Sequence, residues 1–128
     1  MGSWVGQYCI YVSDLERTIA FYETLGLQCT SRTDIPNVKE AIVENPNQGG
    51  GKIQLAQKLD SDDAIDMGNA LWKLYINTDN CQGLHETAVG AGYQSVMEPT
   101  RLERWPVTVA FLADPDGYQV ELVQRHDD

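Results

Sequence analysis

The chain has 128 residues and a formal net charge of −10. This length predicts one compact domain, or two small modules that share a core, and it is long enough to fold without a disulfide or a metal. Because negative charges repel one another, the acidic sequence argues against nucleic acid and anionic membranes as partners.

The N-terminal residues lack the basic and apolar regions of a secretory leader. No apolar stretch approaches the roughly 20 residues that a membrane-spanning helix needs. The three cysteines, Cys9, Cys29 and Cys81, are odd in number and widely spaced, which indicates reduced thiols rather than a disulfide framework or a zinc site. We therefore expect a cytoplasmic protein.

The first half of the chain predicts one strand, one helix and three further strands. Residues 4–12 alternate as a strand does, and Asp14 is a good N-cap for the helix that follows. Apolar residues recur at helical spacing from Leu15 to Leu25, and Gly26 is placed to end the helix. The three remaining strands are expected at 27–33, 38–44 and 52–57.

The second half repeats this pattern. Asn80 and Gly92 are 12 residues apart, as are Asp14 and Gly26, and the two pairs are offset by 80 − 14 = 66 residues. Strands are expected at 72–79, 93–97, 107–112 and 118–124, with a tight turn at 114–117. Duplication of one βαβββ unit is the economical interpretation. It predicts a first module at 1–58, a second at 71–128, and an acidic, solvated linker at 59–70.

Two runs carry a resemblance to a known family. The run from Val12 to Leu27 (VSDLERTIAFYETLGL) and the run from Phe111 to Leu122 (FLADPDGYQVEL) resemble the vicinal oxygen chelate superfamily. That group includes glyoxalase I, bleomycin-resistance proteins and extradiol dioxygenases. The resemblance implies an α+β fold of paired βαβββ modules, each curving its sheet into a half-barrel around a cavity.

The resemblance also implies four metal-ligand positions, one on the first and one on the last strand of each module. These positions hold Gln7, Gln54, Lys73 and Glu121. One carboxylate and two neutral amides attract a divalent ion weakly, and a charged lysine has no lone pair to offer. We therefore expect no catalytic metal; a divalent metal (Ni, Zn, Mn or Fe) is the alternative. Lys73 either pairs with Glu121 or extends outward into solvent.

Strand alternation predicts which side chains line the ligand cavity. The opposite strand faces should pack on the helices, through Tyr8, Ile10, Val12, Leu74 and Ile76. Trp105, with Arg101 and Arg104, is expected in a loop, either as a rim of the cavity or as ordinary surface. A mixture of rings and polar groups suits a small organic ligand. The cavity residues are Gln7, Cys9, Tyr11, Gln54, Lys73, Tyr75, Trp105 and Glu121, with Ala56, Asn77 and Gln119 on the same faces.

The resemblance implies a protein that binds a small organic molecule between its modules without a metal. It would either sequester that molecule or act as a glyoxalase-like lyase or isomerase with Glu121 as general base. The alternative is a metal-dependent lyase, isomerase or dioxygenase, such as a lactoylglutathione lyase-like enzyme. Against that alternative, Tyr11, Ala56 and Lys58 stand where glyoxalase I has the Arg, Thr and Asn that bind glutathione.

A third possible function is that of a scaffold domain that binds a partner protein and whose cavity is filled by its own side chains. Because open half-barrels leave sheet edges exposed, and superfamily members of this size are commonly homodimers, we expect a homodimer. Its cavity would be completed either within one chain or across two. His85 and His126 are not expected to be ligands.

Overall fold

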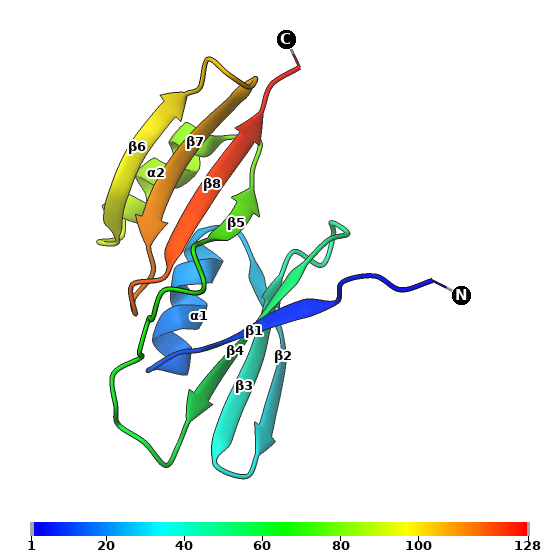
Figure 1. Cartoon of the computed structure of the whole chain (residues 1–128), viewed down its shortest axis with the longest axis vertical. Helices are drawn as coiled ribbons and strands as arrows, with labels where there is room; N and C mark the ends of the chain where they lie inside the picture. The colour runs from blue at the N-terminus through cyan, green and yellow to red at the C-terminus, as the bar shows by residue number, and fades with distance from the viewer. Residues whose placement is uncertain (1, 128) are drawn as a thin grey trace. The chain divides into compact units, whose positions relative to one another are not determined.

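The computed structural model describes residues 2–127. Met1, and Asp128 of the acidic C-terminal pair, lie outside the described residues. The chain forms two compact units, which we call unit 1 and unit 2. Their boundary in the sequence lies between Ile65 and Asp66, inside the segment expected to be a linker. Each unit is an open, mixed four-stranded sheet with one helix, so the predicted α+β class and the paired βαβββ order are confirmed (Figure 1).

The first unit has strand order β1-β4-β3-β2. Strand β1 runs parallel to β4, and the other pairs are antiparallel. Helix α1 packs on β2, β3 and β4 and buries Phe21 and Tyr22 completely. The elements are β1 (Gln7–Tyr11), α1 (Leu15–Thr24), β2 (Gln28–Ile35), β3 (Val38–Glu44) and β4 (Lys52–Lys58).

The second unit repeats this topology in the order β5-β8-β7-β6, with α2 packed on β6, β7 and β8. Helix α2 and strand β6 begin 66 residues after α1 and β2 (81 − 15 and 94 − 28), which is the offset found in the sequence. The elements are β5 (Leu74–Asn77), α2 (Cys81–Gly90), β6 (Gln94–Arg101), β7 (Val107–Ala113) and β8 (Gln119–Arg125).

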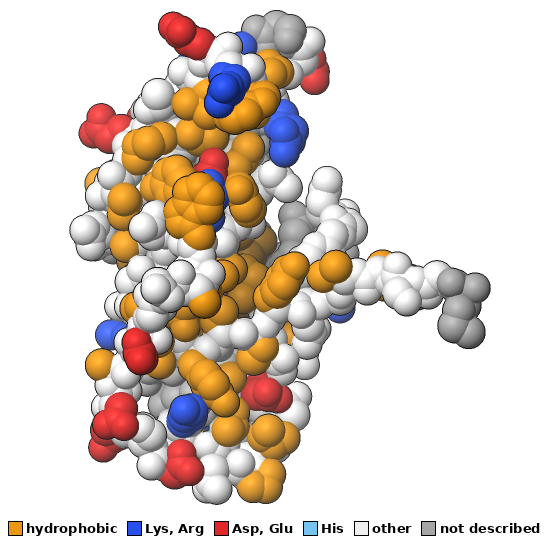
Figure 2. All heavy atoms as spheres, in the orientation of Figure 1, with side chains coloured by type: hydrophobic (Ala, Val, Ile, Leu, Met, Phe, Trp, Pro, Cys, Tyr) orange, Lys and Arg blue, Asp and Glu red, His pale blue; other side chains and the backbone are white. Residues whose placement is uncertain are grey.

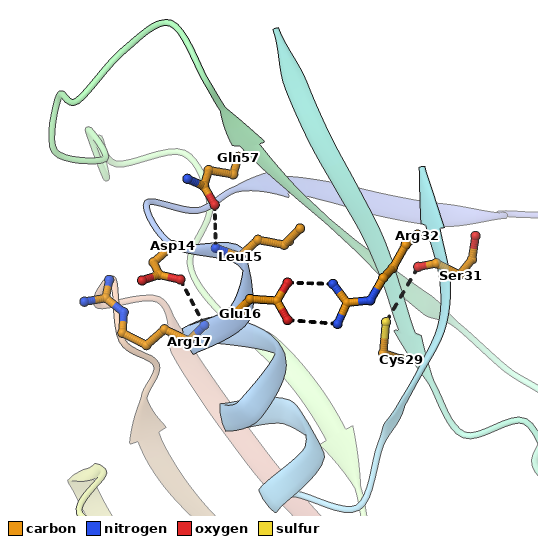
Figure 3. Close-up of polar contacts among 8 residues, drawn as sticks. All are labelled: Asp14, Leu15, Glu16, Arg17, Cys29, Ser31, Arg32 and Gln57. Carbon is orange, nitrogen blue, oxygen red and sulfur yellow. Dashed lines mark hydrogen bonds and ion pairs between the residues drawn. The ribbon is translucent and has the colours of Figure 1, made fainter. Parts of the chain in front are cut away.

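The helix ends are built alike in both units. Asp14 accepts the backbone N–H of Arg17 at 3.1 Å, and the Gln57 side chain accepts that of Leu15 at 2.8 Å (Figure 3). These acceptors satisfy N–H groups that have no partner within the helix. In unit 2, Asn80 and Gln124 do the same for Gly83 and Cys81, and Gly26 and Gly92 follow the helices with φ of 91° and 97°. The predicted caps are confirmed; the two glutamines were not foreseen.

Several strand boundaries differ from those expected. Strands β1 and β5 are shorter than 4–12 and 72–79, because each is a sheet edge that pairs with one neighbour within its unit. Strand β6 is longer and reaches Arg101, so Arg101 lies in a strand and not in the loop. Its register against β7 shifts twice, and the second shift, between Met97 and Thr100, contains Pro99. Such bulges accommodate a proline that cannot donate a hydrogen bond.

The prediction that Tyr8 packs on a helix is wrong. Ile10 and Val12, on the same strand face, are 8% and 2% exposed as expected, but Tyr8 is 65% exposed. The reason is that α1 packs chiefly on β2, β3 and β4. The start of the edge strand β1 therefore lies outside the area that the helix covers.

The cysteines are free, as expected. Cys81 is buried and contacts the Leu122 carbonyl at 3.8 Å, whereas the Cys29 thiol donates to the Ser31 carbonyl at 3.7 Å (Figure 3). His85 is also buried and hydrogen-bonds Ser95. Within residues 2–127, no helix is long and apolar enough to cross a membrane.

Thr18→Val is expected to stabilise the protein. Thr18 lies on the buried face of α1, and its hydroxyl has no hydrogen-bond partner among residues 2–127. Removing an unpaired buried hydroxyl recovers its desolvation cost, so the free energy of unfolding should rise by about 1 kcal/mol. Denaturant unfolding measures this. The control is Thr24→Val on the same helix, whose hydroxyl donates to Ala20; an equal gain in both variants contradicts the argument.

Candidate functional site

A close ion pair lies in unit 2, between the residue before β5 and the middle of β8. Lys73 Nζ is 2.6 Å from Glu121 Oε1, and the two side chains are only 12% and 10% exposed. Of the two alternatives for Lys73, the structure shows the ion pair. Within residues 2–127, Oε1 accepts no hydrogen bond of regular geometry, so charge attraction to Lys73 holds this buried oxygen.

Three aromatic rings surround the ammonium group. Nζ lies 3.9 Å from the centroid of Trp72, 5.0 Å from that of Tyr75 and 5.3 Å from that of Phe111. The negative faces of aromatic rings attract a cation. Figure 2 shows charged side chains lying among hydrophobic ones on this face of the molecule. We call Trp72, Lys73, Tyr75, Phe111 and Glu121 the cation cluster.

The charge state of Lys73 follows from its contacts. The contact with the Glu121 carboxylate raises the pKa of Lys73, and partial burial opposes this less strongly. The side chain therefore stays a charged ammonium at neutral pH. In that state it donates protons in hydrogen bonds and can stabilise a negative oxygen; it does not act as a base.

The equivalent place in unit 1 carries no charge. Gln7 Nε2 donates to Gln54 Oε1 at 3.1 Å, and these residues precede Lys73 and Glu121 by 73 − 7 = 66 and 121 − 54 = 67 positions. Cys9 pairs with Gln54 across β1 and β4, as Tyr75 pairs with Glu121 across β5 and β8. The repeat thus places an amide pair in one unit where the other has an ion pair.

The other predicted cavity residues are not members of the cation cluster. Tyr11 is in unit 1, where Lys58 Nζ lies 4.4 Å from its ring centroid. Trp105 borders a pocket of about 510 Å³ formed by residues 101–106, with the Arg104 guanidinium 5.3 Å from its ring. A smaller pocket of about 150 Å³ adjoins Lys73 and Trp72 and is the nearer one to the ion pair.

The donor set at the four positions implied by the resemblance does not fit a divalent metal. Its single carboxylate, Glu121, is already neutralised by an ammonium 2.6 Å away. A metal ion at this oxygen would have to displace Lys73 against charge repulsion. Within residues 2–127, no group of three or more His, Cys, Asp and Glu side chains is placed to hold a metal.

The turn before β8 is held by a buried carboxylate. Asp114 is 4% exposed, and its Oδ1 accepts the backbone N–H groups of Asp116, Gly117 and Tyr118 at 2.9, 3.0 and 2.9 Å. Burial raises the pKa of Asp114 to about 6, although these hydrogen bonds favour the charged form. The turn sets where β8 begins and so helps to position Glu121.

One member of the cation cluster, Phe111, was not foreseen from the sequence. Trp72 lies next to Lys73 in sequence, and its ring provides the shortest of the ring distances. Phe111 is paired with Glu121 across β7 and β8. Strand alternation on β7 would have found Phe111, because paired residues on neighbouring strands share a face.

The fold and these residues define a class of protein. The family model described as the Glyoxalase/Bleomycin resistance protein/Dioxygenase superfamily matches residues 4–122. The chain belongs to this family.

Its relatives include named enzymes. A lactoylglutathione lyase of Salmonella typhimurium is 29% identical over 120 residues, which are 91% of this chain and 88% of the relative. One of Arabidopsis thaliana is 30% identical over 118 residues, 89% of this chain but 41% of the relative. The crystal structure of glyoxalase I from Zea mays matches with a TM-score of 0.83 and 28% identity, covering 94% of this chain and 44% of that one. The chain thus spans less than half the length of the two plant proteins.

Proposed function

We propose that this protein is a metal-independent enzyme that moves a proton next to the carbonyl group of a small organic substrate. One observation carries the proposal: the ion pair of Lys73 and Glu121, 2.6 Å apart and largely covered by aromatic rings. It combines a base and a fixed positive charge in one place. These are the two groups that proton abstraction beside a carbonyl requires.

The proposed reaction uses only these two side chains. Glu121 takes the proton from the carbon next to the carbonyl. The electron pair of that C–H bond forms a C=C bond, and the carbonyl π pair moves onto oxygen. The Lys73 ammonium donates a hydrogen bond to the resulting enolate oxygen. Glu121 then returns the proton to the same carbon while the electron pair on oxygen re-forms the carbonyl, which gives proton exchange without a co-reactant.

The named relatives support catalysis over sequestration, because the Salmonella typhimurium and Arabidopsis thaliana proteins are both named lactoylglutathione lyases. They also favour a second candidate, a metal-dependent lactoylglutathione lyase-like enzyme using Ni, Zn, Mn or Fe. The uncharged Gln7–Gln54 pair and the occupied Glu121 support the metal-free proposal instead. As further parts of the proposal, the protein is cytoplasmic and homodimeric.

Metal removal is expected to leave the proposed activity unchanged. The measurement is the exchange of α-protons of 2-indanone for deuterium in D2O, followed by NMR before and after treatment with EDTA. Elemental analysis of the same sample should find less than one metal ion per chain. Loss of exchange with EDTA, restored by Ni²⁺, Zn²⁺, Mn²⁺ or Fe²⁺, would overturn the proposal. Metal-dependent formation of lactoylglutathione would establish the second candidate.

A further inference from the structure

The pocket beside Lys73 limits the size of a substrate. Its volume is about 150 Å³, and residues of the segments 67–73 and 117–119 line it. One liquid water takes up about 30 Å³, and pockets for drug-sized ligands begin near 300 Å³. About five water molecules would fill this volume, so the pocket admits only a ligand well below drug size. A peptide conjugate is too large to enter it whole.

The local charge limits the kind of substrate. Lys73 is the single charged residue among those that line the pocket, and Glu121, 2.6 Å from its Nζ, already balances it. An anionic ligand that approached Lys73 would also approach this carboxylate, and the chain carries a net charge of −10. Attraction and repulsion then nearly cancel. A neutral carbonyl oxygen can accept a hydrogen bond from Lys73 without meeting this repulsion.

The rings next to the pocket favour a flat apolar group on the substrate. Trp72 and Tyr75 are 72% and 61% exposed although both lie within about 5 Å of Lys73 Nζ. Trp72 also lines the pocket. Exposed ring faces bind planar apolar groups by stacking and by burying apolar area.

We propose that the substrate is a compact, neutral aldehyde or ketone, smaller than a drug-sized ligand, that carries a planar apolar group beside its carbonyl. This inference rests on the proposed function. In the bound state, the carbonyl oxygen accepts a hydrogen bond from Lys73, and the planar group lies on Trp72. The acidic C–H bond lies toward Glu121, which does not line the pocket itself but is 2.6 Å from Lys73 Nζ.

Two probes of equal size test the charge of the ligand. 2-Indanone is a neutral ketone with a fused ring, and phenylacetate is an anion with about the same number of non-hydrogen atoms. Binding is measured by calorimetry and by tryptophan fluorescence. We expect 2-indanone to bind at least about tenfold more tightly than phenylacetate, and Lys73→Met to weaken its binding about tenfold or more.

Lys52→Met is the matched control. Lys52 also pairs with a glutamate, Glu44, at 3.7 Å, but it lies in unit 1 and has no ring contact among the described residues. This variant should bind 2-indanone as the unmodified protein does. Circular dichroism and thermal unfolding of both variants establish that they are folded. An equal loss of 2-indanone binding in Lys73→Met and Lys52→Met would contradict a specific role for Lys73.

The outcomes separate this inference from the proposed function. Tighter binding of phenylacetate that depends on Lys73 would overturn the neutral class of substrate and leave the cation cluster as the site. Failure of both probes to bind would overturn the inferred size and charge together. Binding of 2-indanone with α-proton exchange that requires an added metal would support the inferred substrate and overturn the metal-free mechanism.

Discussion

Glu121→Gln is expected to lower the rate of α-proton exchange of 2-indanone by about a hundredfold to ten-thousandfold. The amide has nearly the same shape as the carboxylate and keeps an oxygen that can face Lys73, but it cannot take a proton. The ketone should bind about as before, since its carbonyl is held by Lys73 and its ring by Trp72. NMR in D2O measures the exchange, and calorimetry measures the binding.

The matched control for this experiment is Glu44→Gln. Glu44 is a β3 glutamate that pairs with Lys52 and lies outside unit 2, so its loss should leave exchange unchanged. Full exchange activity in Glu121→Gln would exclude Glu121 as the base. If binding disappeared together with exchange, the variant would instead show that Glu121 holds the ligand.

Asp114→Asn is expected to change how stability depends on pH. The pKa of Asp114 is raised by burial from 3.8 to about 6 in the folded protein. The folded state therefore binds the proton more tightly than the unfolded state. The stability that this proton contributes is fully present below about pH 4 and is lost as the pH rises through about 6, up to roughly 3 kcal/mol.

The asparagine variant has no such proton to lose, yet its side-chain oxygen can still accept the three backbone N–H groups of the turn. The free energy of unfolding of Asp114→Asn, relative to the unmodified protein, should therefore rise between pH 4 and pH 7. Urea unfolding at a series of pH values measures this difference. A relative stability that falls over this range would show that the three N–H groups outweigh burial and keep Asp114 ionised.

Asp66→Asn is the control for the pH series. Asp66 likewise accepts a backbone N–H, that of Gly68 at 3.0 Å, but it is exposed. Its substitution keeps the turn acceptor and removes a charge that lies in solvent. The stability difference for Asp66→Asn should stay nearly constant between pH 4 and pH 7.

Much of the fold was predictable because its signals are local. A capping side chain, a helical stripe and a glycine at the helix end lie within about a dozen residues of one another, and the offset of 66 residues shows that the pattern occurs twice. The expectations were wrong where a contact with another helix or strand decides whether a residue is buried or where a strand ends. Tyr8 has the pattern of a buried residue but lies beyond the helix, and β6 continues past Pro99 because bulges tolerate it.

The candidate site was predictable in part. Its four polar positions came from the resemblance, and strand alternation put Tyr75 on the same face as Lys73. The sequence left open whether Lys73 pairs with Glu121, since its long side chain can extend either way. Phe111, which lies 38 positions from Lys73 on another strand, was missed because its place beside Glu121 depends on the pairing of β7 with β8.

By itself, the sequence determined the family, the two βαβββ units, their caps and the acidic, apolar and polar character of each segment. The tertiary structure decided that the ammonium of Lys73 lies on the one carboxylate of the implied metal positions, and which rings enclose it. The physical reason is that these residues are up to 49 positions apart (121 − 72). They meet because β5 pairs with β8 and β8 with β7 in one particular register.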